Sequence, residues 1–372
     1  MRALGIILAG GNNNRMRELS NKRAIAAMPV AGSYRAIDFA LSNMANSHIQ
    51  KVAVLTQYNA RSLNEHLSSS KWWDFGRKQG GLYVFTPTIT AENGYWYRGT
   101  ADAIYQNLDF LKRCHEPYVI ITSGDAVYKM DYNKVLEYHI AKKADITVVC
   151  KELGPNEDAS RFGTIKMNDS MRIEEFEEKP MVAQSQIVST GIYVIRRRQL
   201  IDLIERCAED DRHDFVTDIL IRYKNLKKIY GYKIKDYWSN ISTVDAYYQT
   251  NMDFLKPEVR EYFFRTQPGI YSKVSDLPPA KYNPGSMVKN SLVASGSIIN
   301  GTVENSILFK KTFVGNNCVI KNSIILNDVY LGDNAYIENC IVESRDTIRA
   351  NTRYVGENGV RVVVEKNERY AL

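Results

Sequence analysis

The sequence predicts an α/β domain with a mostly parallel sheet, followed by a second domain that is a parallel β-helix. Over residues 1 to about 250, short apolar runs typical of strands alternate with longer stretches typical of helices. This alternation indicates a mostly parallel sheet that is covered by helices on both faces. From about residue 291, aliphatic residues recur every five or six positions. Such a near-hexad repeat is typical of a parallel β-helix.

The first domain is expected to span residues 1–250. Its predicted strands are Ala3–Leu8, Lys51–Thr56, Tyr118–Thr122, Ile146–Cys150 and Ile192–Ile195. Its predicted helices are Ile37–Ser47, Ala101–Arg113, Tyr132–Lys142 and Gln199–Cys207. Ligands of such sheets bind beyond the carboxyl ends of the strands. Gly10-Gly11 and Gly124-Asp125 each follow directly on an apolar strand, so both are candidates for a ligand site.

Residues 251–290 are expected to form a connector, because they contain the turn signals Asp276-Leu-Pro-Pro279 and Asn283-Pro-Gly285. Residues 291–372 then form the β-helix. The spacing from Val314 to Leu331 and from Leu331 to Ile348 is 17 residues in both cases, close to one coil of three hexads. A meandering antiparallel sheet would instead alternate with period two, which this segment lacks. Because the flanks of stacked coils often serve as subunit contacts, we expect a symmetric oligomer.

The composition of the 372 residues narrows the class of protein. The net charge is +7, and the basic residues are spread out rather than gathered into a stripe, so no nucleic-acid partner is expected. The apolar runs are too short to cross a bilayer, and the first residues lack the features of a signal peptide, which predicts a cytoplasmic protein without a membrane partner. The five cysteines are widely spaced without a Cys-x-x-Cys pair, which argues against disulfides and zinc.

The stretch Leu8-Ala-Gly-Gly-Asn-Asn-Asn-Arg15 begins like a phosphate-binding loop and then departs from that pattern. Backbone N–H groups of a glycine loop after a strand can wrap a polyphosphate. Asn13 stands where a further glycine would be expected. Asparagine tolerates the left-handed backbone region, so the turn can persist. Its side chain nevertheless occupies space that a phosphate would need.

Three other segments carry groups suited to chemistry, each with a plain structural alternative. Asp125, at the end of an apolar strand, is placed to hold Mg²⁺ against phosphates, or else to cap a helix. Gly99 and Thr100 lie at a predicted helix start, where they can meet a nucleobase or cap the helix. Lys179 closes an acidic strand and suits a phosphate, although a solvated charge cluster is the commoner meaning of such a run.

A series of motifs from residue 8 to residue 215 then carries a resemblance to a known family. They are Leu8-Ala-Gly-Gly11 with Arg15, Tyr34-Arg-Ala-Ile-Asp-Phe-Ala-Leu-Ser-Asn43, Leu55-Thr-Gln-Tyr58, Trp96-Tyr-Arg-Gly-Thr-Ala-Asp-Ala-Ile-Tyr-Gln-Asn107, Ser123-Gly-Asp125, Tyr128-Lys-Met-Asp-Tyr132, Ser160-Arg-Phe-Gly163, Glu177-Glu-Lys-Pro180, Gly191-Ile-Tyr193 and His213-Asp-Phe215. Over nearly its whole length the sequence resembles the glucose-1-phosphate adenylyltransferase (ADP-glucose pyrophosphorylase) family of bacterial glycogen synthesis.

The resemblance implies a Rossmann-like nucleotidyltransferase domain with a mixed, mostly parallel sheet, a C-terminal left-handed parallel β-helix, and a tetramer. The implied reaction converts ATP and glucose 1-phosphate into ADP-glucose and pyrophosphate with Mg²⁺. The implied catalytic residues are Asp125, which is also the metal ligand, and Arg15. The other implied site residues are Ala9, Gly10, Gly11, Gly99, Thr100 and Ala101 for the nucleotide; Tyr97, Gly163, Glu178, Lys179 and Asp214 for the sugar phosphate; and Lys22, Arg23 and Arg35 for phosphorylated effectors.

The match breaks at four places around the nucleotide phosphates and the metal. Family enzymes have glycine at the position of Asn13 and lysine at the position of Ile25. They have a second metal-holding aspartate at the position of Asn240, whose neutral amide does not offset the charge of the ion. Their Asp-Phe-Gly-Lys-Asp is altered to Asp-Phe-Val-Thr-Asp at 214–218. Loss of one preorganised charge-stabilising group typically lowers kcat by about 10²–10³.

The pattern resembles the non-catalytic subunit that some Gram-positive bacteria pair with a catalytic homologue. The leading hypothesis is therefore a regulatory subunit that is inactive or very weak alone. Its expected partners are a catalytic homologue in a hetero-tetramer, or further copies of itself, together with phosphorylated small-molecule effectors. The alternative is a self-sufficient but slow glucose-1-phosphate adenylyltransferase, in which nearby residues compensate for the losses.

Overall fold

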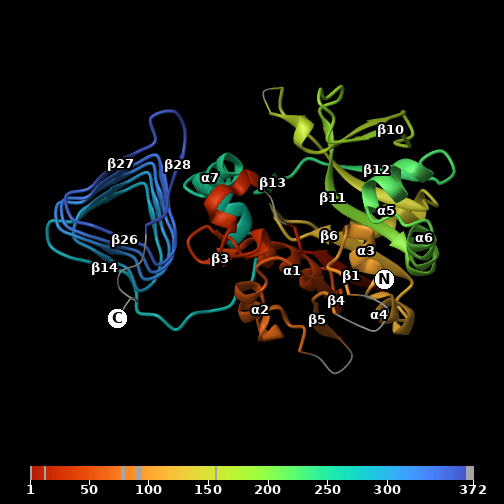
Figure 1. Cartoon of the computed structure of the whole chain (residues 1–372), viewed down its shortest axis with the longest axis horizontal. Helices are drawn as coiled ribbons and strands as arrows, with labels where there is room; N and C mark the ends of the chain where they lie inside the picture. The colour runs from red at the N-terminus through yellow and green to blue at the C-terminus, as the bar shows by residue number, and fades with distance from the viewer. Residues whose placement is uncertain (1, 12–13, 77–79, 89–93, 156, 366–372) are drawn as a thin grey trace.

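The computed structural model in Figure 1 describes residues 2–11, 14–76, 80–88, 94–155 and 157–365. A sheet-and-helix domain, coloured red to green, lies beside a triangular β-helix, coloured blue, and a segment in teal joins them. Both parts agree with the architecture expected from the two different sequence periods. Within the described residues, no helix combines the length and the apolar character that crossing a membrane would require.

The core of the first domain is a nine-stranded mixed sheet. Its main path runs in the order β10-β9-β11-β6-β1-β4-β5, with β8 on β11 and β12 on β8. Strands β6, β1, β4 and β5 pair in parallel, whereas β11 runs antiparallel to its neighbours. The strands are β1 Ala3–Leu8, β4 Lys51–Leu55, β5 Gly81–Phe85, β6 Tyr118–Ser123, β8 Ile146–Glu152, β9 Gly163–Met167, β10 Ile173–Glu178, β11 Ile187–Arg196 and β12 Ile229–Ile234.

Two short strand pairs lie outside this sheet and matter for the site. They are β2 (Pro29–Val30) with β3 (Tyr34–Arg35), and β7 (Ala126–Tyr128) with β13 (Trp238–Asn240). The second pair brings residues far apart in the sequence, Asp125 and Asn240, to neighbouring positions.

Helices pack on both faces of the sheet (Figure 1). The α-helices are α1 Ala36–Asn46, α2 Arg61–Leu67, α3 Thr100–Tyr105, α4 Leu108–Arg113, α5 Tyr132–Ala141, α6 Arg197–Glu209, α7 Val244–Asp253 and α8 Pro257–Arg260. The short helical turns are η1 Asn14–Ser20, η2 Ile25–Ala27, η3 Ser70–Trp73, η4 Ala159–Arg161, η5 Val216–Ile221 and η6 Glu261–Arg265.

The single helix predicted for Ala101–Arg113 is wrong, because α3 and α4 are separate. Asn107 leaves the helical region between them, with φ −114° and ψ 21°. Its side-chain amide donates to Ala103 O over 2.8 Å and to the Tyr97 hydroxyl over 3.0 Å. Asparagine side chains that bond to nearby backbone groups compete with the helical pattern in this way.

The β-helix consists of three parallel sheets of five strands each, in the orders β14-β17-β20-β23-β26, β15-β18-β21-β24-β27 and β16-β19-β22-β25-β28. Its strands are β14 Lys281–Tyr282, β15 Met287–Lys289, β16 Leu292–Val293, β17 Ile298–Ile299, β18 Thr302–Glu304, β19 Ile307–Leu308, β20 Phe313–Val314, β21 Val319–Lys321, β22 Ile324–Ile325, β23 Tyr330–Leu331, β24 Tyr336–Glu338, β25 Cys340–Val342, β26 Thr347–Ile348, β27 Arg353–Val355 and β28 Arg361–Val363. Pairing begins at Lys281, before residue 291, so the last part of the expected connector already belongs to the first coil.

The repeat has a clear physical basis in the sequence. The side chains of Val314, Leu331 and Ile348 are fully buried and belong to one apolar core. Asparagines recur at one corner of successive coils with positive φ, at 290, 305, 322 and 339. Because asparagine accepts the left-handed conformation more readily than most residues, these positions turn the chain from one sheet to the next.

An apolar cluster joins the two domains. It contains buried residues of the first domain, of the joining segment and of the β-helix, including Ile25, Phe39, Phe263, Ile307 and Ile341. The hydroxyl of Tyr248 in α7 also donates to the Asn322 carbonyl in the β-helix over 2.6 Å. The β-helix is therefore packed against the first domain as part of one core.

Candidate functional site

The glycine loop and Asp125 lie at the same edge of the sheet. Strands β1 and β6 are parallel and pair Leu8 with Ser123, so the residues after both strands leave the sheet side by side. Gly124 N donates to Leu8 O over 2.9 Å, and Ala9 N donates to Leu55 O over 2.8 Å, which ties the three strand ends together. The structure thus brings together Ala9, Gly10, Gly11 and Asp125 as predicted.

Gly11 is a glycine that the surrounding fold does not require. A Cβ built at this position has no heavy atom within 4 Å, apart from its chain neighbours. The space beside the loop is open, as a phosphate-binding loop needs. Arg15 follows in η1 with an exposed side chain. Asn13, one of the four predicted losses, lies outside the described residues.

Asp125 and Asn240 are neighbours across the small β7–β13 pair. Asn240 pairs with Ala126, and Ile241 N donates to Asp125 O over 3.0 Å. The Asp125 carboxylate accepts a hydrogen bond from the Ser123 hydroxyl. The Asn240 side-chain oxygen accepts from Ser242 N over 3.0 Å, so it is already engaged in a local turn.

These residues do not fit the two-aspartate metal site that the family resemblance implies. Mg²⁺ is usually held by one or two carboxylates together with substrate oxygens. Here one carboxylate, Asp125, stands beside a neutral amide whose oxygen already accepts a backbone hydrogen bond. Within the described residues there is no group of three or more His, Cys, Asp or Glu side chains arranged for a metal.

Ile25 lies in the protein interior. It begins η2, its side chain is 4% exposed, and it belongs to the apolar cluster that joins the domains. A lysine at this position in an active enzyme offers a positive charge to phosphates. The alkyl side chain present here contributes to packing and offers no charge.

The backbone at Gly99–Ala101 is hydrogen-bonded to a distant part of the chain, so the N–H of Ala101 is not available to a nucleobase. The N–H groups of Ala101 and Asp102 donate to His213 O over 2.8 and 3.1 Å. A Cβ on Gly99 would overlap that same carbonyl group, so glycine is needed here for close packing. The Thr100 hydroxyl donates to the Asp214 carboxylate over 3.2 Å. The start of α3 therefore has a complete structural role without a ligand.

The predicted sugar-phosphate residues divide into two groups. Glu178 pairs with Gly163 across β10 and β9, and Lys179 Nζ lies 3.2 Å from Glu178 Oε1. Burial raises the pKa of Glu178, Lys179 opposes this rise, and the nearby Asp214 carboxylate adds to it. These four residues therefore lie together. Tyr97 makes other contacts: its N–H donates to Gln57 Oε1 over 2.6 Å, and its hydroxyl accepts from the Asn107 amide over 3.0 Å.

Asp214 is engaged in the local fold. Its Oδ1 accepts from Val216 N over 2.9 Å and from Thr217 N over 2.8 Å. The Thr217 hydroxyl also donates to it over 3.1 Å. The residues that replace the Gly-Lys pair of the family thus complete a turn around Asp214.

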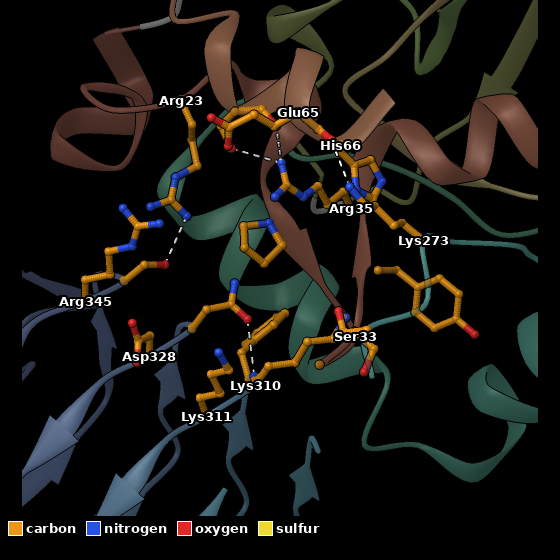
Figure 2. Close-up of a pocket in the computed structure, with 18 of the residues that line it drawn as sticks. Arg23, Ser33, Arg35, Glu65, His66, Lys273, Lys310, Lys311, Asp328 and Arg345 are labelled. Carbon is orange, nitrogen blue, oxygen red and sulfur yellow. Dashed lines mark hydrogen bonds between the residues drawn. The ribbon is translucent and has the colours of Figure 1, made fainter. Parts of the chain in front are cut away.

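A large cavity lies elsewhere, lined by residues of the first domain, the joining segment and the β-helix. Its volume is about 1240 Å³, and Lys22, Arg23 and Arg35 all line it. Figure 2 shows Arg23 and Arg35 among the side chains around it. Eight Lys and Arg side chains line it against three Asp and Glu. We call it the interdomain pocket; its basic residues are Lys22, Arg23, Arg35, Arg61, Lys273, Lys310, Lys311 and Arg345.

The electrostatics of this pocket favour an anion. Burial lowers the pKa of Arg35, Asp38 opposes that change, and the Arg23 charge lowers it further. Burial likewise lowers the pKa of Lys310, with Asp38 opposing and Arg35 reinforcing the change. Buried cations that repel one another are stabilised when an anion binds between them. The Arg35 guanidinium is oriented by hydrogen bonds to Ser62 O and Oγ over 2.8 and 2.9 Å.

Five basic residues of the interdomain pocket were not predicted from the sequence. Arg61 comes from α2 and Lys273 from the joining segment, while Lys310, Lys311 and Arg345 come from the β-helix. The last four lie more than two hundred residues after Arg35 and follow no local motif. The β-helix register does show that 311, 328 and 345 share a corner, since all three have positive φ. The sequence does not show which corner of the β-helix faces the first domain, so Lys311 and Arg345 could not be assigned to this pocket from the sequence.

Comparisons with known proteins agree with this architecture. The model of the nucleotidyl transferase family matches residues 4–257, and that of the GlmU-like C-terminal hexapeptide family matches residues 278–362. Three relatives, each named glucose-1-phosphate adenylyltransferase, cover 85% of this chain. The protein of Clostridium botulinum (strain Alaska E43 / Type E3) is 41% identical over 83% of its own length, that of Clostridium novyi 39% over 84%, and that of Thermosipho melanesiensis 39% over 77%.

The chain belongs to the glucose-1-phosphate adenylyltransferase family. The hexapeptide match and the three parallel sheets agree with the predicted left-handed β-helix. Against the adenylyltransferase pattern, the glycine loop, Asp125, Glu178 and Lys179 are retained. Ile25 and Asn240 each stand where that pattern has a charged residue, a lysine at position 25 and an aspartate at position 240.

Proposed function

We propose that this chain is a regulatory subunit of ADP-glucose pyrophosphorylase. It modulates a catalytic homologue that makes ADP-glucose and pyrophosphate from ATP and glucose 1-phosphate. The observation that carries the proposal is the Asp125–Asn240 pair, in which the second carboxylate is replaced by an amide engaged with Ser242. Phosphoryl transfer depends on positioning and charge neutralisation, so a centre without this charge and the lysine charge at position 25 is expected to turn over poorly.

The interdomain pocket supports the regulatory side of the proposal. Its basic residues include Lys22, Arg23 and Arg35, the three positions matching the effector region of the family. A phosphorylated small molecule there would contact both domains at once. A ligand that contacts both domains stabilises one arrangement of the two domains. In a mixed tetramer, the contacts between subunits can then stabilise the corresponding state of a catalytic partner.

A slow, self-sufficient adenylyltransferase is the second candidate. It is favoured by the retained Asp125 and Lys179 and by the open space at Gly11. This candidate predicts turnover by the chain alone, whereas the regulatory subunit predicts an effect only on a partner.

One experiment separates the two. The purified chain is assayed with ATP, glucose 1-phosphate and Mg²⁺, alone and mixed with a catalytic homologue. The regulatory proposal expects negligible turnover alone and a changed rate or effector response of the homologue on mixing. A kcat for the chain alone within the usual enzyme range of about 1–10³ s⁻¹ would overturn it. No change of the homologue on mixing would count equally against it.

A further inference from the structure

Glu343 of the β-helix is a fully buried acidic residue at the edge of the interdomain pocket. It follows β25, and its side chain is 0% exposed. The Arg23 guanidinium of the first domain forms its ion pair through Nη2. Ser344 N donates to the same oxygen, Oε1, over 2.6 Å. The other oxygen, Oε2, is buried with no hydrogen-bond partner among the described residues.

Arg23 and Arg35 face the pocket in different electrostatic states. Arg35 donates from Nη1 to neutral oxygens of Ser62, so its charge is offset by no carboxylate in those bonds. Arg23 is 11% exposed and bound to the Glu343 carboxylate, with a further hydrogen bond from Nη1 to Ser344 Oγ over 3.2 Å. Figure 2 shows Arg23 pointing from the first domain toward the β-helix segment that carries Arg345. Arg23 thus forms an ion pair within 4 Å with an internal carboxylate, whereas among the described residues Arg35 has carboxylates only at longer range, Asp38 and Glu65.

A second buried carboxylate lies near Glu343 and increases the energetic cost of leaving Glu343 without a positively charged partner. Asp346 lies three residues further on and is also buried. Burial raises the pKa of Asp346 to about 6, and the Glu343 charge contributes to the rise. Because like charges in a buried site repel, Glu343 depends on Arg23 for compensation. Removal of Arg23 by a competing anion would leave a buried negative charge on the β-helix.

We infer that Glu343 is an internal competitor for the anion that binds the interdomain pocket. In the unliganded chain its carboxylate holds Arg23, and a phosphate ligand binds by taking Arg23 from Glu343. The exchange breaks one contact between the first domain and the β-helix and so couples ligand binding to the docking of the two domains. This inference rests on the proposed role of the pocket as the effector site, and it adds how that site is regulated.

The test measures binding of inorganic pyrophosphate by isothermal titration calorimetry in Mg²⁺-free buffer. Arg35→Gln identifies the site, because pocket binding by the wild type should be lost in that variant. Glu343→Gln should tighten binding by about tenfold or more, since a neutral amide no longer competes for Arg23. Glu304→Gln is the matched control. It makes the same charge change in the β-helix at a partly exposed carboxylate, with Lys289 3.5 Å away and outside the pocket lining, and should leave the affinity unchanged.

The outcomes separate the inference from the proposed function. If the wild type shows no pyrophosphate binding that Arg35→Gln removes, the effector role of the pocket fails. If such binding exists but Glu343→Gln matches the wild type, the competitor role fails. Weaker binding by Glu343→Gln would also overturn it, because Glu343 would then be positioning Arg23 for the ligand. If Glu343→Gln does not fold, Glu343→Asp is read by the same criteria, since the shorter side chain withdraws from Arg23.

A double-variant comparison removes the remaining ambiguity. Arg23→Gln should weaken binding, and adding Glu343→Gln to it should then have no further effect. A tightening by Glu343→Gln that persists without Arg23 would show that the effect does not pass through this ion pair, and the inference would fail.

Discussion

The backbone N–H of Ile241 donates to the carbonyl oxygen of Asp125 over 3.0 Å, and this bond places Asn240 beside Asp125. The family resemblance implies a metal-binding aspartate at each of these two positions; here their backbones are paired, and position 125 carries a carboxylate while position 240 carries an amide. A backbone that is still in place can be tested by restoring a single side chain.

Asn240→Asp should create a response to Mg²⁺ that the wild type lacks. Aspartate has nearly the shape of asparagine and can keep accepting from Ser242 N, so the turn should persist. Two adjacent carboxylates repel each other until a cation binds between them. A ligand that binds only the folded state stabilises it, by about 1.4 kcal/mol at ten times its dissociation constant. Thermal unfolding with and without Mg²⁺ measures this. Asp125→Asn added to the variant should abolish the response, and an equal response in the wild type would contradict the interpretation.

Ile25→Lys should destabilise the fold by about 2–5 kcal/mol, because it puts an ammonium group into an apolar cluster and removes a packed side chain. Ile25→Met keeps the volume and should cost less than about 1.5 kcal/mol. Urea unfolding of both variants gives the comparison. Equal stability of the lysine variant and the wild type would mean that the ammonium group can reach solvent without cost.

Restoring three positions together tests the cause of the expected inactivity. The variant Asn13→Gly, Ile25→Lys and Asn240→Asp should recover measurable turnover with ATP and glucose 1-phosphate. Its folded fraction must be measured alongside, since the lysine is costly. Persistent inactivity of the folded variant would show that the cause lies elsewhere, for example in the altered turn after Asp214.

Two glycines of the predicted nucleotide site should differ in how strongly alanine affects stability. Gly99→Ala pushes a methyl group into His213 O and should destabilise the fold by about 1–3 kcal/mol. Gly11→Ala meets no neighbour and should change stability by less than about 0.5 kcal/mol. Thermal unfolding of the two variants is the measurement. If Gly11→Ala is the more destabilising of the two, the open space beside the loop is misplaced.

Asp346 should make the fold more stable as the pH falls from 7 to 5. Burial raises its folded pKa to about 6, above the value of about 4 in the unfolded chain, so the folded state binds the proton more tightly in that range. Burial lowers the pKa of His139 to about 4, which has the opposite effect between about pH 6.5 and 4. The two contributions oppose each other in the wild type.

Asp346→Asn isolates the first contribution. The amide can still accept the Glu365 N–H, which donates to Asp346 over 2.9 Å. The variant should be more stable than the wild type at pH 7, by an amount on the order of 1–3 kcal/mol, and the difference should shrink toward pH 4. Unfolding curves at several pH values measure it. A difference that stays constant with pH would exclude Asp346 as the titrating group.

Local patterns in the sequence predicted the sheet and the β-helix well, because the apolar residues that are buried recur at regular intervals along both parts of the chain. The strand β1 was predicted with its observed bounds, and Gly11 and Asp125 were placed at the correct edge. The break between α3 and α4 was missed because it depends on where the side chain of Asn107 bonds.

The site was harder to predict where a residue's role depends on distant chain segments. The motif around Gly99 contains no sign that His213 O would take the N–H groups of Ala101 and Asp102. The family resemblance indicates that isoleucine stands in place of lysine at position 25. It does not indicate that Ile25 is buried in a cluster shared with the β-helix. The basic half of the interdomain pocket that comes from Lys310 and Arg345 likewise requires the docking of the two domains.

The burial of Ile25 bears on how this chain could change over time. A side chain that joins a core shared by two domains allows its neighbours, such as Ile307 and Ile341, to adjust their own size and shape to it. A lysine at position 25 would meet a surrounding that suits an alkyl side chain, whatever stands at positions 13 and 240. Substitution at Ile25 is therefore tied to the packing between the two domains, and compensating changes would be expected in the β-helix as well as in the first domain.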